Sequence, residues 1–286
     1  YAMVASDEAI VDSNLDLEKI NKFRVGVIWG AGIGGLETFQ NEAINFGAGD
    51  GTPRFNPFFI PKMIADIAPG NISIKNGFMG PNYTTVSACA SSANAMIDAL
   101  NYIRLGTCDI IVTGCSEAAV AIAGVGGFNA MQALSTRNES PETASRPFDS
   151  ERDGFVLGEG AGAIILEEYE HAKARGAKIY AEIVGYGATS DGADMVAPSG
   201  EGAVRCMQQA MQGLDKPIDY INTHGTSTPV GDVKELWAIR EVFGDKTPPL
   251  SATKAMTGHA LGAAGVNEAI YSILMMENDF IAPSIN

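Results

Sequence analysis

The chain has 286 residues, of which 46% are hydrophobic and 19% are charged. This length and composition predict one or two joined domains with a large buried core, and they argue against intrinsic disorder. With 19 basic and 34 acidic residues the formal charge is −15, which disfavours nucleic acid and anionic membrane surfaces as partners.

The sequence has no run of about 18 apolar residues and does not begin with the basic, then apolar, pattern of a signal peptide. We therefore expect a cytoplasmic protein. Its four cysteines show neither CxxC spacing nor the density of a disulfide scaffold, and three histidines make a zinc cluster hard to assemble. No metal site is predicted.

Glycine-punctuated apolar runs alternate along the chain with longer helical patterns, which is typical of an α/β fold. The first residues already follow a helical pattern. Strands are predicted at 24–30, 108–118, 160–169, 180–189 and 218–225, and helices at 89–104, 167–176, 202–213, 232–244 and 261–278. Apolar spacing predicts that the helix 89–104 buries Ala93, Met96, Ile97, Leu100 and Ile103, and that the last helix buries Val266, Ile270, Ile273, Leu274 and Met276.

The stretch 135–154 is polar and lacks core periodicity, so we expect it on the surface. Its charged residues are expected to pair among themselves; they include Arg146, Asp149, Arg152 and Asp153. Elsewhere, residues 84–100 and 220–239 both follow the order strand, small-residue turn, helix. This weak echo hints at a duplicated unit.

A GxGxxG match, formed by Gly30, Gly32 and Gly35, follows the first predicted strand. A dinucleotide site would also need an acidic residue about 20 positions further on, at the end of a second strand, and that region reads as a loop. We therefore interpret these glycines as allowing close backbone packing, and nucleotide binding is the less favoured alternative.

Cys89 falls in the first turn of the predicted helix 89–104, among small neighbours that leave room for a substrate. Unpaired backbone N–H groups and the helix dipole favour a thiolate at such a position. By position alone a buried, inert cysteine remains an equal alternative. For Cys108, Cys115 and Cys206 inert packing is the favoured interpretation.

Histidines in two downstream loops favour the reactive interpretation. His224 follows a predicted strand in THGTSTPVGD, and SATKAMTGHALGAAG supplies Lys254 and His259 before the last helix. A cysteine with two loop histidines and a lysine indicates nucleophilic catalysis. The third histidine, His171, lies on a charged helix and is expected to be a solvated surface residue.

The motifs VSACASSANAM, RPFDSERDGFVLGEGAGAIILE, NTHGTSTPVGD and TKAMTGHALGAAG, in this order, resemble the β-ketoacyl-acyl-carrier-protein synthases, the condensing enzymes of fatty-acid synthesis. The resemblance covers nearly the whole chain. It implies a thiolase-like α-β-α-β-α sandwich of two similar halves, here 1–178 and 179–286. It also implies a homodimer, acyl carrier protein as the partner, and no cofactor beyond the phosphopantetheine that carries the substrates.

The resemblance also assigns roles to residues. It implies a catalytic set of Cys89, His224 and His259 with Lys254, pantetheine contacts from Thr226 and Thr228, and a supporting acid at Glu268. Because carrier proteins are acidic and this chain carries −15, a local basic patch is needed, and Arg54 and Lys62 are the candidates for docking. Scattered, solvated charges are the equally simple alternative for that pair.

The chain departs from the family pattern at its end, because the glycine-rich loop that supplies the second oxyanion donor and a gating phenylalanine does not follow Asn286. We therefore expect a fragment, cut at both termini. Its N-terminal part resembles type II synthases, whereas its C-terminal part is more similar to type I. The alternatives are a polyketide-type ketosynthase, a degradative thiolase, and an inactive fragment or non-catalytic acyl-binding partner subunit.

Overall fold

A computed structural model describes the whole chain, residues 1 to 286. Contacts divide it into two compact units whose segments interleave along the sequence. The first unit contains Tyr1–Gly127, Gly158–Tyr180 and Ala260–Ile270, and the second contains Phe128–Leu157, Ala181–His259 and Tyr271–Asn286. The predicted halves 1–178 and 179–286 remain a prediction, because the two contact-based units have other boundaries and each consists of three segments.

The first unit is built on a four-stranded mixed sheet of order β2-β1-β3-β4. Its strands are β1 (Val25–Gly30), β2 (Asn82–Thr85), β3 (Ile110–Glu117) and β4 (Gly160–Glu167). β1 pairs in parallel with β2 and β3, and β4 is antiparallel to β3. Every residue of β1 is buried, as expected for a parallel strand covered on both faces. Three predicted strands, 24–30, 108–118 and 160–169, are confirmed.

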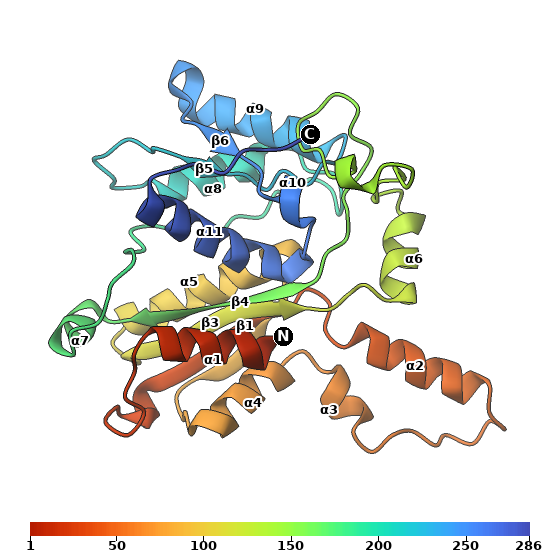
Figure 1. Cartoon of the computed structure of the whole chain (residues 1–286), viewed down its shortest axis with the longest axis horizontal. Helices are drawn as coiled ribbons and strands as arrows, with labels where there is room; N and C mark the ends of the chain where they lie inside the picture. Colours follow the sequence, from red (N-terminus) through yellow and green to blue (C-terminus); the bar gives the residue numbers. More distant parts are fainter. The chain divides into compact units, whose positions relative to one another are not determined.

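Helices cover both faces of this sheet (Figure 1). On one face α1 (Ala2–Asp12) and α4 (Ile67–Asn76) pack against Val25, Val27 and Trp29, which alternate along β1 and point to the same side. On the other face α5 (Ser91–Arg104) packs with Ile28 and Ile111. This division follows from the strand geometry, in which successive side chains point to opposite faces.

The helix predicted at 89–104 exists, but its buried stripe is not the predicted one. The fully buried positions of α5 carry small side chains, at Ser91, Ser92, Ala95 and Ala99, while the larger predicted residues are only half-buried. The reason is close packing on the sheet: a Cβ added to Gly30 would lie 2.9 Å from the backbone of Ser91. Bulky residues cannot occupy that contact line.

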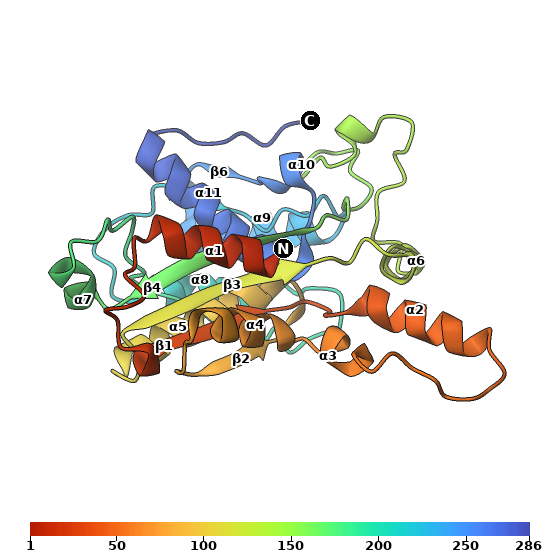
Figure 2. The same cartoon turned by 60° about the horizontal axis from the view of Figure 1, so that its bottom comes forward.

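The remaining elements of the first unit are short helices and turns. Two of them, α2 and α3, project from the sheet in both views (Figures 1 and 2) and bury no side chain. The sequence pattern did not predict them. These elements are η1 (Lys22–Arg24), α2 (Leu36–Gly47), α3 (Phe59–Met63), η2 (Ala88–Ala90), α7 (Tyr169–Ala174) and η5 (Leu261–Ala263). Helix α6 (Ile122–Ala130) begins in the first unit and ends in the second.

The second unit contains a two-stranded parallel sheet, formed by β5 (Ile221–Asn222) and β6 (Leu250–Ser251). The predicted strand 218–225 is thus reduced to two residues. Its helices and turns are η3 (Pro141–Thr143), α8 (Glu201–Ala210), α9 (Gly231–Phe243), η4 (Gly244–Lys246) and α10 (Lys254–Thr257). The last helix, α11 (Ala264–Asn278), begins in the first unit and ends in the second.

Two further predictions need correction. Residues 180–189 form no strand; Gly185 and Gly187 lie against backbone carbonyls of α8, so this apolar segment packs on a helix instead of pairing with a strand. In α11, Leu274 and Met276 are exposed and Met275 is buried in their place. No helix in the structure has both the length and the hydrophobicity needed to span a bilayer.

Candidate active site

Cys89 lies in the first unit, in the short turn η2 between strand β2 and helix α5, and it is half-buried. The residue before it, Ala88, has a φ of +49°, a left-handed conformation that is unusual for a residue with a side chain. Such conformations persist where the surrounding structure holds them, and they concentrate at functional sites. The predicted placement of Cys89 at a helix start is confirmed.

One hydroxyl group holds this turn in place. The Oγ of Ser91 accepts the N–H of Ser87 at 2.9 Å and lies 2.7 Å from the carbonyl oxygen of Ala88 and 3.0 Å from that of Ala31. It therefore links both sides of Cys89 to the segment that follows β1. The small residues of ACASS serve this packing as well as substrate access.

The glycines of the GxGxxG match allow close packing, as predicted. A Cβ at Gly35 would lie 2.6 Å from the Cα of Met63, and a Cβ at Gly32 would lie 3.0 Å from the backbone nitrogen of Gly262. The N–H of Gly32 donates to the carboxylate of Glu117 at 2.7 Å. The N–H of Gly32, which a phosphate would need as a donor in a dinucleotide site, is thus already paired with a carboxylate of the protein.

The two predicted catalytic histidines meet in the second unit. The rings of His224 and His259 lie 5.2 Å apart between centroids at 87°, and the ring of Phe155 packs edge-on against His259 at 5.3 Å. The backbone N–H of His259 donates to the carbonyl of Val156 at 2.8 Å. His259 is almost completely buried, with 3% of its surface exposed.

The environment keeps both imidazoles neutral. Burial, followed by the positive charge of Lys254, lowers the pKa of His259 to about 3. His224 retains exposed surface, yet the protein atoms around its ring lower its pKa well below the ordinary value, and Lys254 and His259 lower it further. Neutral imidazoles can donate an N–H to a developing oxyanion at physiological pH.

A carboxylate that the sequence pattern did not single out fixes the loop of His224. Glu235, on α9, accepts the backbone N–H groups of His224 at 2.6 Å and Gly225 at 2.8 Å. Burial raises the pKa of Glu235, and the two N–H donors and Lys254 oppose that rise. The only feature of the sequence that could have indicated this role is an acidic residue on a predicted helix, eleven positions after the loop histidine.

The polar stretch 135–154 does not form a detached surface insert. Arg146 pairs with Asp149 at 2.8 Å as predicted, but Arg152 reaches the histidine loop, donating to the carbonyls of Thr228 at 3.0 Å and Pro229 at 2.7 Å. Arg152 also lies 3.4 Å from Asp232, which is 1% exposed. The stretch is polar because it supplies backbone donors and a buried cation to the loop 223–229.

Further polar contacts complete this loop. Asp153 accepts hydrogen bonds from Ser135 and Thr136 instead of pairing with an arginine. Asp232 accepts the N–H of Phe148 at 2.8 Å. Ser227 has a φ of +68°, and its carbonyl accepts the N–H of Gly154 at 3.0 Å. The loop is thus held in a strained conformation by neighbours from a distant segment.

The predicted pantetheine contacts lie beside each other in the same loop. The hydroxyls of Thr226 and Thr228 are 3.0 Å apart, and Thr226 is buried whereas Thr228 is half-buried. Lys254 begins α10 and is 2% exposed, and its backbone carbonyl accepts the hydroxyl of Ser145 at 2.5 Å. The second unit therefore gathers both histidines, the lysine and both threonines.

The other predicted residues lie in the first unit. Glu268 is half-buried on α11. Arg54 is exposed and lies 3.6 Å from the exposed carboxylate of Asp50, while Lys62 is exposed on α3 and forms no ion pair. His171 is not simply solvated, because its Nδ1 lies 2.5 Å from the buried carboxylate of Glu167.

The cysteines assigned to packing behave accordingly. Cys108 and Cys115 are 1% and 0% exposed, and burial raises the pKa of both thiols. Cys206 is half-buried on α8, with its Sγ 3.2 Å from the carbonyl of Gly187. Their high pKa values argue against a nucleophilic role.

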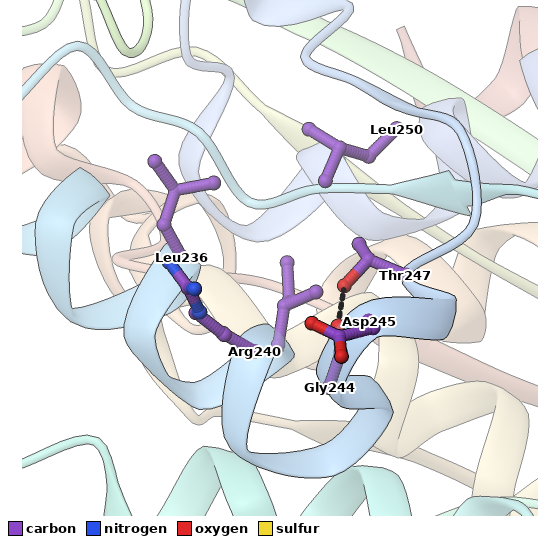
Figure 3. A pocket seen from close by; sticks show the side chains of 7 residues that line it. Leu236, Arg240, Gly244, Asp245, Thr247 and Leu250 are labelled. Carbon is purple, nitrogen blue, oxygen red and sulfur yellow. Dashed lines mark hydrogen bonds between the residues drawn. The ribbon is translucent and has the colours of Figure 1, made fainter.

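A concavity of about 300 Å³ lies at the C-terminal end of α9 (Figure 3), and none of the predicted site residues lines it. The hydroxyl of Thr247 closes one side by donating to the carbonyl of Gly244 at 2.9 Å. It is lined by Leu236, Ile239, Arg240, Gly244, Asp245, Thr247 and Leu250.

Comparisons with known proteins cover the whole chain. The sequence model of the beta-ketoacyl synthase N-terminal domain matches residues 1–172, and that of the C-terminal domain matches residues 180–286. The chain is 55% identical over 294 residues to 3-oxoacyl-[acyl-carrier-protein] synthase 1 of Escherichia coli (strain K12), covering 100% of this chain and 71% of that protein. It is 48% identical to 3-oxoacyl-[acyl-carrier-protein] synthase 2 of Staphylococcus aureus, covering 100% of this chain and 72% of that protein.

Solved structures agree. A beta-ketoacyl synthase from Burkholderia phymatum STM815 superposes with a TM-score of 0.93 at 39% identity, over 100% of this chain and 70% of that one. A type II polyketide ketosynthase, solved in complex with its acyl-carrier protein and bound to a hexaketide, gives 0.91 at 34% identity, over 99% and 72% of the two chains. The predicted α/β, thiolase-like fold class is confirmed.

Proposed function

We propose that this chain, which belongs to the beta-ketoacyl synthase family and is a 3-oxoacyl-acyl-carrier-protein synthase of fatty-acid biosynthesis, uses Cys89 as its nucleophile and His224 and His259 as oxyanion donors. The observation that carries these assignments is the adjacent histidine pair, in which His259 is buried and the surroundings lower both pKa values. Such a pair suits hydrogen-bond donation to an enolate better than proton abstraction.

In the proposed cycle the thiolate of Cys89 attacks the acyl thioester on carrier protein. The acyl group becomes a Cys89 thioester, and the carrier thiol leaves. Its place at the start of α5 supports this role, because helix N-terminal N–H groups stabilise a thiolate. Splitting acyl transfer from condensation replaces one difficult step with two easier ones.

Malonyl-carrier protein then loses carbon dioxide, and its breaking C–C bond supplies the electron pair of an enolate. Neutral His224 and His259 each donate an N–H to the thioester oxygen of that enolate. The carbanion attacks the acyl carbonyl, a new C–C bond forms, and the Cys89 thiolate leaves. Lys254 acts electrostatically by keeping both imidazoles neutral. The cycle needs no metal or cofactor.

The substrates are proposed to arrive on acyl carrier protein. The solved ketosynthase in complex with its acyl-carrier protein supports this partner class. Lys62 is the stronger docking candidate because it is exposed and unpaired, whereas Arg54 has Asp50 beside it. Thr226 and Thr228 are proposed to contact the pantetheine, and Glu268 to act as a supporting acid.

A charge reversal separates docking from chemistry. Lys62→Glu should raise KM for carrier-borne acyl groups several-fold and leave KM for acyl-CoA unchanged. Lys216→Glu, at an exposed lysine of the second unit that forms no ion pair, is the matched control. Equal effects of both variants on both substrates would remove Lys62 from the docking surface.

A homodimer is proposed from the aromatic surface of α2, α3 and the loop between them. Phe39, Phe46, Phe55 and Phe58 are 41–64% exposed, and the ring of Phe55 lies 5.5 Å from those of both Phe46 and Phe59. Exposed aromatic clusters of this kind mark protein interfaces. Phe55→Ser should dissociate the dimer in sedimentation velocity experiments, whereas Ile74→Ser, at an exposed residue of α4, should not.

The main test is intact-protein mass spectrometry after incubation with acyl-carrier protein. One acyl adduct should form on the native chain and be absent from Cys89→Ser and Cys89→Ala. His224→Ala and His259→Ala should still form the adduct but lose malonyl decarboxylation by about 10²–10³-fold. His171→Ala is the control and should form the adduct and keep the native rate of malonyl decarboxylation. An adduct that persists in both Cys89 variants would refute the assignment.

The rival assignments are less well supported. The fatty-acid synthases named above match at 48–55% identity, whereas the polyketide ketosynthase matches at 34%. A non-catalytic partner subunit would not need Cys89 and a histidine pair held neutral. A thermal-shift titration with NAD(P)H tests the nucleotide alternative. We expect no stabilisation, because the carboxylate of Glu117 already accepts the N–H of Gly32 in the glycine segment.

A further inference from the structure

Glu117 is a buried carboxylate that the proposed reaction does not use. It is the last residue of β3, is 3% exposed, and has no basic side chain within ion-pair distance. Its Oε2 accepts the N–H groups of Gly32 at 2.7 Å and Gly262 at 3.2 Å, and its Oε1 accepts that of Ile33 at 3.3 Å. All these partners are donors, which suits an ionised carboxylate.

Two glycines are explained by this carboxylate. A Cβ at Gly262 would lie 2.9 Å from the Oε2 of Glu117 and 2.6 Å from the nitrogen of Gly32, and a Cβ at Gly32 would collide with the same carboxylate. The backbone is therefore shaped around the acid. Leu261, directly before Gly262, has a φ of +47°, so the carboxylate also holds a strained turn.

The same contacts lead to the nucleophile within the first unit. The carbonyl of Ala31, next to Gly32, lies 3.0 Å from the Oγ of Ser91. The same hydroxyl contacts the backbone of Ser87 and Ala88, the two residues before Cys89. The turn η5, which contains Gly262, packs against η2, which contains Cys89. Glu117 thus joins the two backbone segments between which the strained turn of Cys89 lies.

We propose that Glu117 is a positioning residue for the nucleophile: its carboxylate fixes the segment after β1 and the turn Leu261–Ala263, and so holds Cys89 at the start of α5. This inference rests on the proposed role of Cys89. It assigns to Glu117 no contact with substrate. A buried acid without a cation is costly to maintain, and the geometry gives it a task that a neutral side chain performs less well.

The test compares Glu117→Gln and Glu117→Ala with the native chain and with Val112→Ala. Val112 is completely buried in the same strand, so its truncation lowers stability without touching either turn. The first readout is the rate of acyl transfer to Cys89. The second is the pH profile of Cys89 alkylation by iodoacetamide, located by peptide mass mapping and measured where circular dichroism shows each variant folded.

We expect Glu117→Gln, which keeps one acceptor oxygen, to acylate about tenfold more slowly, and Glu117→Ala, which loses all three hydrogen bonds, to be slower by about 1000-fold, at about a factor of ten for each hydrogen bond lost. The alkylation profile should move to higher pH in both, and Val112→Ala should match the native chain. If Glu117→Ala does not fold, the isosteric Gln variant decides the matter.

Native rates and a native pH profile in Glu117→Gln would overturn the inference. Loss of acylation in proportion to stability, matched by Val112→Ala, would also overturn it, because Glu117 would then be structural only. If the native chain accepts no acyl group, the proposed role of Cys89 fails instead. The alkylation profile still tests Glu117 in that case, since it needs no acyl substrate.

Discussion

The buried imidazole of His259 should make the stability of this protein depend on pH in a defined window. Its pKa is lowered to about 3, so the unfolded chain binds this proton more readily than the folded one. The free energy of unfolding is therefore unaffected by this group above the pKa of histidine in the unfolded chain, near 6.5. It falls as the pH is lowered from 6.5 towards 3. The full effect is about 5 kcal/mol, and between pH 7.5 and pH 5 it is about 2 kcal/mol.

The assay is urea unfolding at pH 7.5 and pH 5, followed by circular dichroism, for the native chain and for His259→Asn. The variant cannot take up the proton, so its loss of stability on acidification should be smaller by about 2 kcal/mol. Phe155→Leu is the matched control, because it alters the packing on the same ring without removing a titratable group. It should lower stability equally at both pH values.

An equal loss in the native chain and in His259→Asn would refute the reasoning. It would mean that the imidazole is hydrated and titrates normally. Decarboxylation of malonyl-carrier protein would then show an acid limb near the ordinary pKa of histidine. If the reasoning holds, the rate stays flat from pH 8 to pH 6, since no proton enters the site in that range.

Three further predictions concern the groups around the histidines. Glu235→Ala leaves the backbone N–H groups of His224 and Gly225 without their acceptor, and thermal unfolding should show a loss of about 1–3 kcal/mol. Arg152→Met leaves Asp232 as an unpaired buried charge and should cost about 3–5 kcal/mol in urea unfolding, partly recovered in the double variant with Asp232→Asn. Lys254→Met removes a charge that lowers both imidazole pKa values, so the acid limb of the decarboxylation rate should move to higher pH.

The residues predicted from sequence share a local signature. Cys89 and His224 follow strand-like runs, His259 precedes a glycine-rich turn into an apolar helix, and each lies in a contiguous motif rich in small residues. Local sequence also predicts three of the four strands of the first sheet, β1, β3 and β4, because hydrophobic runs bounded by glycine are typical of buried strands. These features need no knowledge of what the segments pack against.

The residues that sequence did not predict depend on distant backbone. Glu117 binds N–H groups 84, 85 and 145 positions away, and Arg152 binds a carbonyl 76 positions away. Backbone N–H and C=O groups occur along the whole chain, so residue types do not show which of these groups a distant side chain binds. The failed strand 180–189 has the same origin, because alternation records burial and does not say whether a strand or a helix provides the cover.

The carboxylates of this protein explain why its histidines differ from those of a hydrolase triad. In such a triad an acid accepts the imidazole N–H and stabilises the imidazolium, which makes the histidine a base. Here Glu235 directs both oxygens to backbone N–H groups of the histidine loop, so it fixes the loop without raising the basicity of the ring. Burial and Lys254 then act in the same direction on both imidazoles. The arrangement therefore favours stabilising an enolate formed by loss of carbon dioxide over removing a proton from the substrate.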